Sequence, residues 1–322
     1  MSKLNKIFIG IRESKLSRAQ TEIFIKEANK SEYIKDNYCF EIKTVKTTGD
    51  IHNTHRLDRL GGKGLFIKEI EEQILSGTID MGIHSLKDVP SQDINDELEL
   101  IYWSERVKSN DVLISNSGKK ITELEPGSII GTSSIRRRAQ ILHLRQDLNI
   151  KLLRGNVDTR LKKLRNKEYD AIILSHAGLT RMGLASEITE VLEFKNFLPA
   201  ACQGVVAVQA KKNFVLKKII GALSNKISEE ESTAERLVLK KINANCNSPV
   251  SIYANINKNN ITIKFEIFDH HGNKIFKKSK EDTKENYVKL CDELGEEIIN
   301  AVGQTKINEL DNLKSDFDYT PS

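Results

Sequence analysis

Two distant stretches of this 322-residue chain repeat the same order of residue types. Residues 10–20 and 131–140 each leave an apolar strand pattern, pass through hydroxyl residues and enter a helical pattern that ends in Arg-Ala-Gln. Residues 79–85 are echoed by residues 169–176, where an Asp is followed by apolar residues and then by Ser and His. Strand, turn and helix in this order form an α/β unit, so the repeat predicts two similar α/β halves that face each other across a cleft. Helix N-termini and hydroxyl groups in such a cleft favour anion binding.

A group of polar residues follows the first of these apolar runs. Residues 84–90 read His-Ser-Leu-Lys-Asp-Val-Pro and close the run that begins at Ile79. Pro90 ends the predicted strand because proline has no N–H to donate. Lys87 and Asp88 therefore lie at the carboxyl end of a strand, which in open α/β sheets is where ligands bind. A solvated turn pair is the alternative interpretation of these two charges.

Length and composition predict a globular protein of two or three domains. With 322 residues, of which 39% are hydrophobic and 30% charged, the chain can bury more than one core. It contains no apolar run of about 18 residues and no secretory signal, so we expect a cytoplasmic protein without membrane association. The four cysteines are far apart and lack Cys-x-x-Cys spacing, so we expect neither a metal site nor a disulfide framework.

Positive charge is concentrated in one part of the sequence. Residues 131–181 hold twelve Lys and Arg against four acids, a local charge of +8 in a chain whose net charge is +5. Such a field attracts polyanions, either nucleic acid or a multiply carboxylated small molecule. Arg154 and Arg160 flank the start of a helix predicted at 157–167, where cations oppose the helix dipole, and this indicates an anion between them. Nucleic acid is disfavoured because the basic residues lack interleaved aromatic residues.

The last hundred residues predict a small third domain of the α+β class. A helix is expected from Ser228, then strands at 250–256 and 261–268, and a final helix at 283–302. The segment 197–204 is expected to return the chain to the first half and to act as a hinge. These boundaries give three domains, namely residues 1–103 with 201–222, residues 104–200, and residues 223–322.

Six motifs along residues 6–302 occur in the order in which one known family has them. They are Arg12-Glu-Ser14, Gly61-Gly-Lys-Gly64, His84-Ser-Leu-Lys-Asp-Val-Pro90, Gly131-Thr-Ser-Ser-Ile-Arg-Arg137, Leu153-Arg-Gly-Asn-Val157 with Arg160, and Cys246 with Pro249. The chain thus resembles the porphobilinogen deaminase family, also called hydroxymethylbilane synthase. The resemblance implies two similar lobes, like those of periplasmic binding proteins, around a cleft, plus a small α+β C-terminal domain. It also implies a transferase of haem biosynthesis that joins four porphobilinogen molecules into hydroxymethylbilane and releases ammonia at each step.

The resemblance further implies a dipyrromethane cofactor, bound as a thioether to Cys246. A thiolate is a strong nucleophile toward the methylene group left when ammonia departs. Each pyrrole carries two carboxylates, for which guanidinium groups are suitable bidentate partners. The implied cofactor-binding residues are Ser85, Lys87, Thr132, Ser133, Ser134, Arg136, Arg137, Arg154 and Gly155. The implied substrate-binding residues are Arg12, Ser14, Lys63, Arg160, Arg181 and Gln203.

Asp88 is the carboxylate that the matched motifs place at a strand end among these cations. It is expected to accept pyrrole N–H bonds, to stabilise a cationic azafulvene-like intermediate and to assist departure of the amine. Lys63, in a glycine-rich loop, is expected to close over the site. The family also suggests a monomer.

Three departures from the family pattern and one rival hypothesis remain. Cys202 stands where a glycine is expected, Ala244-Asn245 where glycine or serine is usual, and Gln209 where an acid is expected. The rival hypothesis is a non-catalytic, two-lobed anion sensor whose closure signals to a partner. Asp88 distinguishes the two, because a pure anion receptor gains nothing from a carboxylate among its arginines.

Overall fold

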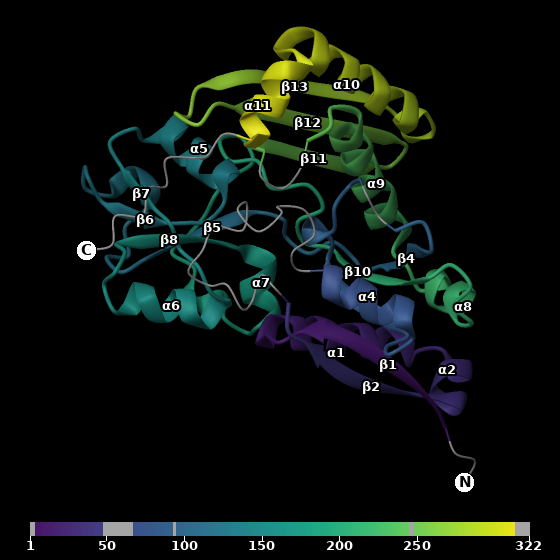
Figure 1. Cartoon of the computed structure of the whole chain (residues 1–322). Coiled ribbons are helices and arrows are strands. Elements are labelled where there is room, and N and C mark those ends of the chain that lie inside the picture. Colours follow the sequence, from purple (N-terminus) through teal and green to yellow (C-terminus); the bar gives the residue numbers. More distant parts are fainter. Residues whose placement is uncertain (1–3, 48–66, 93–94, 245–247, 313–322) are drawn as a thin grey trace. The chain divides into compact units, whose positions relative to one another are not determined.

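The computed structural model describes residues 4–47, 67–92, 95–244 and 248–312 (Figure 1). The chain forms two compact units, and we describe each by itself. Unit 1 comprises Met1–Val107 with Gly204–Glu230, and unit 2 comprises Lys108–Gln203 with Glu231–Ser322. The chain passes from unit 1 to unit 2 after Val107, close to the expected boundary after residue 103. It returns to unit 1 after Gln203, at the end of the expected hinge segment. The division into three domains stays a prediction.

Unit 1 is built on a five-stranded sheet of order β2-β1-β3-β10-β4. β1 runs parallel to β2 and β3, whereas β10 runs antiparallel to β3 and β4. The strands are β1 (Asn5–Arg12), β2 (Tyr38–Val45), β3 (Met81–Ser85), β4 (Leu98–Trp103) and β10 (Val206–Lys211). The helices of this unit are α1 (Lys15–Ala28), α2 (Glu32–Asn37), α4 (Lys68–Ser76) and α8 (Lys217–Ala222), with a 3-10 turn η2 (Leu86–Asp88).

Unit 2 contains a second five-stranded sheet, of order β7-β6-β8-β5-β9. Position by position, its strands correspond to those of the unit 1 sheet. β6 is parallel to β7 and β8, and β5 is antiparallel to β8 and β9. The strands are β5 (Asp111–Ser115), β6 (Ile129–Gly131), β7 (Asn149–Lys151), β8 (Ala171–Ser175) and β9 (Glu190–Val191). The helical segments are η3 (Ile121–Glu123), α5 (Ile135–Leu144), α6 (Val157–Arg165), α7 (His176–Arg181) and η4 (Ala185–Glu187). The prediction of two similar α/β halves is therefore confirmed.

The internal repeat extends to individual hydrogen bonds. The Asp80 N–H donates to the Phe8 carbonyl at 2.9 Å, and the Asp80 carboxylate accepts the Phe8 N–H at 2.7 Å. Asp170 does the same with Ile129, again at 2.7 Å to the carboxylate. In each unit this aspartate fixes the third strand of the repeat beside the first. The bond from the Phe8 N–H also explains why β3 begins at Met81 and not at residue 79, where the strand was predicted to begin. Because the Asp80 side chain takes this N–H, the backbone ladder does not extend to residue 79.

Unit 2 also holds a three-stranded antiparallel sheet, β11-β12-β13, with helices packed on it (Figure 1). The strands are β11 (Val250–Asn257), β12 (Asn260–Phe268) and β13 (Lys274–Thr283). The helical segments are α9 (Lys226–Lys241), η5 (Lys284–Asn286), α10 (Tyr287–Val302) and α11 (Gln304–Asn312). Ile252, Phe265 and Leu294 meet in one buried apolar cluster. The expected helix at 283–302 begins only at Tyr287, because the residues before it complete β13 and a 3-10 turn.

Serine caps begin the helices that follow three of the strands. Ser14 Oγ accepts the Ser17 N–H at 3.0 Å and so caps α1, as the sequence predicted. Ser134 caps α5 and Ser175 caps α7 in the same way, at 3.4 and 3.3 Å. A serine oxygen satisfies one of the unpaired N–H groups of the first helical turn. Strand ends, hydroxyl groups and helix N-termini are thereby brought to the same edge of each sheet.

Candidate active site

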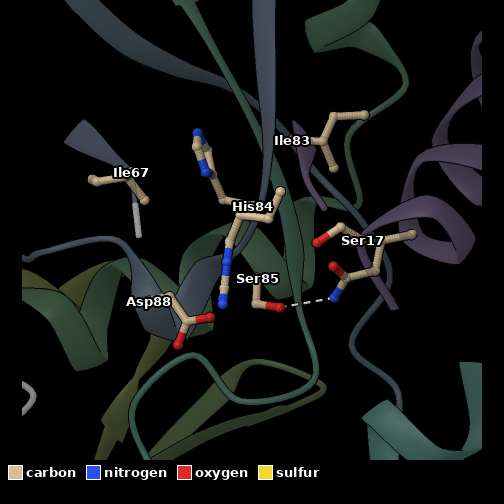
Figure 2. A pocket seen from close by; sticks show the side chains of 8 residues that line it. Ser17, Ile67, Ile83, His84, Ser85 and Asp88 are labelled. Atoms are coloured by element: carbon tan, nitrogen blue, oxygen red, sulfur yellow. Dashed lines mark hydrogen bonds between the residues drawn. The ribbon is translucent and has the colours of Figure 1, made fainter. Parts of the chain in front are cut away.

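Unit 1 has a pocket at the carboxyl end of β3. Its lining residues are Arg12, Ser17, Gln20, Ile67, Ile83, His84, Ser85 and Asp88 (Figure 2). Asp88 is the only carboxylate among these described lining residues. Leu86 is fully buried and its N–H donates to the Val205 carbonyl at 3.0 Å, while Val89 is also buried. These two apolar anchors fix η2, so that the Asp88 carboxylate between them is held at the pocket.

The pocket wall is formed where β1, β3 and α1 meet. Gly10 of β1 pairs with Gly82 of β3, so Arg12 lies level with the end of β3. From α1, the buried Gln20 donates its Nε2 to Ser85 Oγ at 2.8 Å, the bond drawn in Figure 2. A guanidinium group, a carboxylate and a hydroxyl group therefore share one small pocket. Such a set of groups can bind an anion and can also exchange a proton with a bound ligand.

His84 contributes an uncharged imidazole to this pocket. It is only 4% exposed, and burial lowers its pKa to about 4. Gln209 acts in the opposite direction and Arg12 adds to the lowering, but burial is the largest cause. Burial disfavours the charged form of an imidazole, so His84 is neutral at neutral pH.

In unit 2 the predicted anion-binding residues lie at neighbouring strand ends. β6 leads to Thr132, Ser133 and Ser134, and the buried Thr132 accepts the Ser134 N–H at 3.1 Å. After the adjacent β7, Gly155 has a φ of +109°, and its carbonyl accepts Arg160 Nε at 2.7 Å. Carboxyl ends of adjacent parallel strands meet at one edge of a sheet, so the hydroxyls and Arg160 belong to one edge. Arg154 and Arg181 are partly buried residues following β7 and β8.

Arg136 and Arg137, two predicted cofactor ligands, lie in a buried ionic cluster. Asp111, which is completely buried, accepts Arg136 Nη2 at 2.7 Å and Arg137 Nη2 at 2.6 Å. Arg136 also donates to the Leu198 carbonyl and Arg137 to the Ile173 carbonyl, at 2.8 and 3.0 Å. Much of each guanidinium fork is thus bound to protein groups, and both side chains are buried.

The carboxylate of this cluster stays ionised. Burial alone would raise the pKa of Asp111, but the two guanidinium groups outweigh burial and hold this pKa well below its ordinary value. Gln203, a predicted substrate ligand, also belongs to the cluster, since its Nε2 donates to Asp111 at 2.9 Å and to the Ser109 carbonyl at 2.7 Å. Sequence reasoning did not identify Asp111, because an acid at the start of a strand carries no pattern that reveals burial.

The remaining predicted site residues differ in where the structure places them. Ser14 caps α1, and Lys87 lies in η2 beside Asp88. Lys63 and Cys246 fall outside the described residues. The structure thus brings Arg12, Ser85 and Asp88 together in unit 1. It brings the hydroxyls and Arg160 to one sheet edge in unit 2.

Duplicated α/β units, a carboxylate pocket and a cationic, hydroxyl-rich strand edge are features of a protein that binds an anionic ligand and can exchange a proton with it. The family model of the porphobilinogen deaminase dipyrromethane cofactor-binding domain matches residues 7–215, and that of the C-terminal domain matches residues 229–300. The chain belongs to the porphobilinogen deaminase family.

Individual relatives agree with this membership. Porphobilinogen deaminase of an Exiguobacterium species is 39% identical over 303 residues, which cover 94% of this chain and 97% of that protein. The porphobilinogen deaminase of Francisella tularensis subsp. holarctica is 41% identical over 308 residues, 95% of this chain and all of that protein. The resemblance inferred from the six motifs is therefore confirmed.

Solved structures of binding proteins show a weaker likeness. A putative methionine-binding lipoprotein of Bacillus subtilis is 12% identical, with a TM-score of 0.44 over 70% of this chain and 93% of that chain. The periplasmic aliphatic sulphonate binding protein of Escherichia coli is 14% identical, with a TM-score of 0.40 over 74% of this chain and 70% of that chain. In the described part of the chain, no helix has the length and apolar character needed to span a bilayer.

Proposed function

We propose that this chain performs the porphobilinogen deaminase reaction with the two groups of residues described above. The enzyme is a transferase that joins four porphobilinogen molecules into hydroxymethylbilane, with release of ammonia at each step, in tetrapyrrole biosynthesis. Its cofactor is dipyrromethane, which supplies the terminal pyrrole carbon to which substrate is joined. The observation that carries the assignment of roles is the position of Asp88, held by η2 in a pocket that also contains Arg12.

Asp88 is the catalytic residue in this proposal. Its carboxylate accepts the pyrrole N–H of the bound substrate and stabilises the positive charge that develops as ammonia departs. When each carbon–carbon bond is complete, Asp88 accepts the proton that the ring carbon loses, and in this protonated form it gives the proton to the amine of the next porphobilinogen, which departs as ammonia and leaves Asp88 ionised again. Buried anchors on both sides of Asp88 support this role, because a carboxylate on a fixed turn needs little reorganisation during the reaction.

The donor groups of the two units suit a cofactor with four carboxylates. Hydroxyl and N–H groups at the start of α5, together with guanidinium and ammonium groups, are the chemical partners that carboxylates require. Arg136 and Arg137 take part through the donors that Asp111 does not use. The proposed cofactor-binding residues are Ser85, Lys87, Thr132, Ser133, Ser134, Arg136, Arg137, Arg154 and Gly155, with Cys246 as the point of attachment.

Acetate and propionate groups of incoming porphobilinogen need further cations. The pairing of β1 with β3 supports Arg12 in this role, since it places the guanidinium beside the Asp88 turn. The proposed substrate-binding residues are Arg12, Ser14, Lys63, Arg160, Arg181 and Gln203. The buried position of Gln203 in the Asp111 cluster supports an indirect part, in which it orients the arginine forks.

The test of the proposal is the Asp88→Asn variant. We expect kcat for ammonia release and hydroxymethylbilane formation to fall by about 100-fold or more, because asparagine can neither transfer a proton nor balance the developing cation. Intact-mass spectrometry of the same variant is expected to show the dipyrromethane adduct still bound. Asp88→Glu, which keeps the charge, is the matched control and retains more activity.

Three results would each contradict part of the proposal. Wild-type turnover in Asp88→Asn would remove the catalytic role of the carboxylate. Absence of any turnover in the wild-type holoprotein, with ligand binding kept or strengthened in Asp88→Asn, would support an anion sensor. A Cys246→Ala variant that still carries the adduct would overturn the attachment site, whereas Cys202→Ser is expected to carry it unchanged.

We further propose that the protein works as a monomer in the cytoplasm and without nucleic acid. The two complete α/β units within one chain support the monomer, since no second copy is needed to supply either sheet. Light scattering of the holoprotein is expected to give the mass of one chain. A dimer mass would overturn this part of the proposal.

A further inference from the structure

Three polar side chains, two of them buried and one half-buried, form a row on the face of the unit 1 sheet that α4 covers. The row consists of Glu71 on α4, Gln209 on β10 and His84 on β3. Gln209 is completely buried and donates its Nε2 to Glu71 Oε1 at 2.7 Å. No role in the reaction has so far been given to any of the three residues.

Gly82 provides the space in which His84 meets Gln209. Gln209 is the ladder partner of Gly82 in the antiparallel pairing of β10 with β3. A Cβ on Gly82 would lie 2.9 Å from His84 Nε2 and 2.5 Å from Ile70 Cγ2, so the imidazole occupies the place that a side chain would take. The imidazole and the Gln209 amide are therefore on the same face of neighbouring strands.

The two facing polar atoms of this row are both unsatisfied. His84 Nε2 and Gln209 Oε1 are buried and have no hydrogen-bond partner among the residues that the structure describes. A buried donor or acceptor without a partner is unfavourable, so a small movement that joins the two atoms is favoured. An amide oxygen can only accept, and the nitrogen that meets it must therefore carry the proton.

Glu71 determines which end of the amide faces the histidine. A carboxylate oxygen accepts hydrogen bonds, so it binds the NH2 end of Gln209 and leaves the oxygen end for His84. This arrangement selects the Nε2–H tautomer and leaves Nδ1 with a lone pair. It also gives His84 a neutral partner and no counter-ion.

We propose that Gln209, oriented by Glu71, is a positioning residue that holds the buried, uncharged His84 in its Nε2–H tautomer at the pocket of Asp88. The inference rests on the proposed function, because its consequence concerns the catalytic carboxylate. An imidazolium here would add a second cation, besides Arg12, to the lining of the Asp88 pocket and so weaken the ability of the carboxylate to stabilise the substrate cation or to move a proton. Charged residues on the elements packed around His84 include Arg12 of β1, Glu69 and Glu71 of α4, and Lys87 and Asp88 of η2.

The test exchanges the two polar residues in the variant Glu71→Gln/Gln209→Glu. The exchange keeps the composition and the hydrogen bond between positions 71 and 209, but it moves the carboxylate next to the imidazole. An adjacent opposite charge raises a histidine pKa by about 1–3 units, so we expect His84 to titrate about 2 pH units higher. Nitrogen and carbon NMR of labelled imidazole groups measures this shift directly. The acidic limb of the kcat profile is expected to move upward with it.

Wild-type protein and a second variant complete the test. Wild-type His84 is expected to show the Nε2–H tautomer and no protonation above pH 5, about one unit above its pKa. Gln209→Met keeps the bulk but removes the acceptor, so a mixture of tautomers is expected with the pKa still low. An Nδ1–H tautomer in the wild type, or the same His84 titration in the exchanged variant, would overturn the inference.

The NMR readout is independent of turnover. If the protein failed to deaminate porphobilinogen, the tautomer and titration of His84 would still decide whether Gln209 positions it. If the NMR results held but the pH profile of kcat did not move, the link between His84 and Asp88 would be rejected while the proposed function remained.

Discussion

The buried carboxylate of Asp111 compensates the positive charge of two buried arginines. It is completely buried, and its two oxygens accept hydrogen bonds from Arg136 and Arg137. Removing one partner of a buried ion pair is costly because the remaining charge loses its compensation. Removal of the Asp111 charge would leave the guanidinium groups of both Arg136 and Arg137 buried without a counter-ion.

We therefore expect Asp111→Asn to lower the free energy of unfolding by about 3 kcal/mol or more at pH 7. The pKa of Asp111 is depressed in the folded state, so its stabilising contribution is full above the ordinary carboxyl pKa of about 4 and is lost as the pH falls below it. The difference in urea unfolding free energy between wild type and variant should accordingly shrink between pH 5 and about pH 2. A difference that is constant with pH would contradict this assignment. Asp158→Asn, on the exposed face of α6, is the matched control and is expected to change stability by less than about 0.5 kcal/mol.

At the scale of single elements, the loop before α6 depends on one glycine. Gly155 has a φ of +109°, and a Cβ at this position would lie 2.8 Å from the Cβ and Cγ2 of Thr159. Both the backbone conformation and the contact with α6 therefore exclude a side chain. This loop also provides the carbonyl that binds Arg160.

Gly155→Ala is expected to lower the free energy of unfolding by about 2–4 kcal/mol, of which about 1–2 kcal/mol is backbone strain and the rest is the steric conflict. Gly183→Ala is the matched control, since Gly183 has a φ of +70° but nothing within 4 Å of its Cβ position. It should lose only the strain component. If both variants lost the same free energy of unfolding, measured by heat or urea, the contact with Thr159 would make no contribution to the loss. Adding Thr159→Ala to Gly155→Ala is expected to restore part of the stability.

The sequence predicted most helices and strands in which apolar residues recur at regular spacing. It missed strands in which charged residues obscure that spacing. β13 was not predicted, because its sequence Lys-Ile-Phe-Lys-Lys-Ser-Lys-Glu-Asp-Thr is rich in lysine, as is usual for an edge strand. Its lysines pair with acids outside the strand, for example Lys280 with Glu297 at 2.6 Å. β5 was also missed, since it begins with a charged residue that only the tertiary structure neutralises.

The site was predictable where motifs are local and unpredictable where contacts are distant. Asp88 was expected at the carboxyl end of a strand, and the structure places it in η2, directly after β3, at the pocket. Contacts such as Gln209 with Glu71, or Gln203 with Asp111, join residues far apart in the sequence. Hydrophobic periodicity carries no information about these polar pairs, because each lies at a position that also fits an apolar residue.

The sheet of unit 1 combines strands from two separate parts of the chain. In unit 1, β10 lies between β3 and β4, although it follows them by about a hundred residues. In unit 2, β5 takes the same place between β8 and β9 but precedes them. The sheet of unit 1 therefore needs a strand from beyond residues 108–203, whereas all five strands of the unit 2 sheet come from that one continuous segment.

A fragment of residues 1–107 is expected not to fold, because β4 has no neighbour without β10 and the buried residues Val206 and Val208 are missing. The same fragment joined through a short flexible linker to residues 204–230 should recover a cooperative urea transition. Circular dichroism and amide hydrogen exchange measure both outcomes. Cooperative unfolding of residues 1–107 alone would contradict the prediction, and a joined fragment in which Gln209 is replaced by Pro serves as an unfolded control.

The position of β10 also has a consequence for the newly made chain. Residues 206–211 leave the ribosome only after all of β5 to β9 has been synthesised. Until then, β3 presents an open edge with unpaired backbone groups, of the kind that promotes aggregation. Nascent chains of this protein should therefore depend on holding chaperones for longer than their early start with β1 and α1 would suggest.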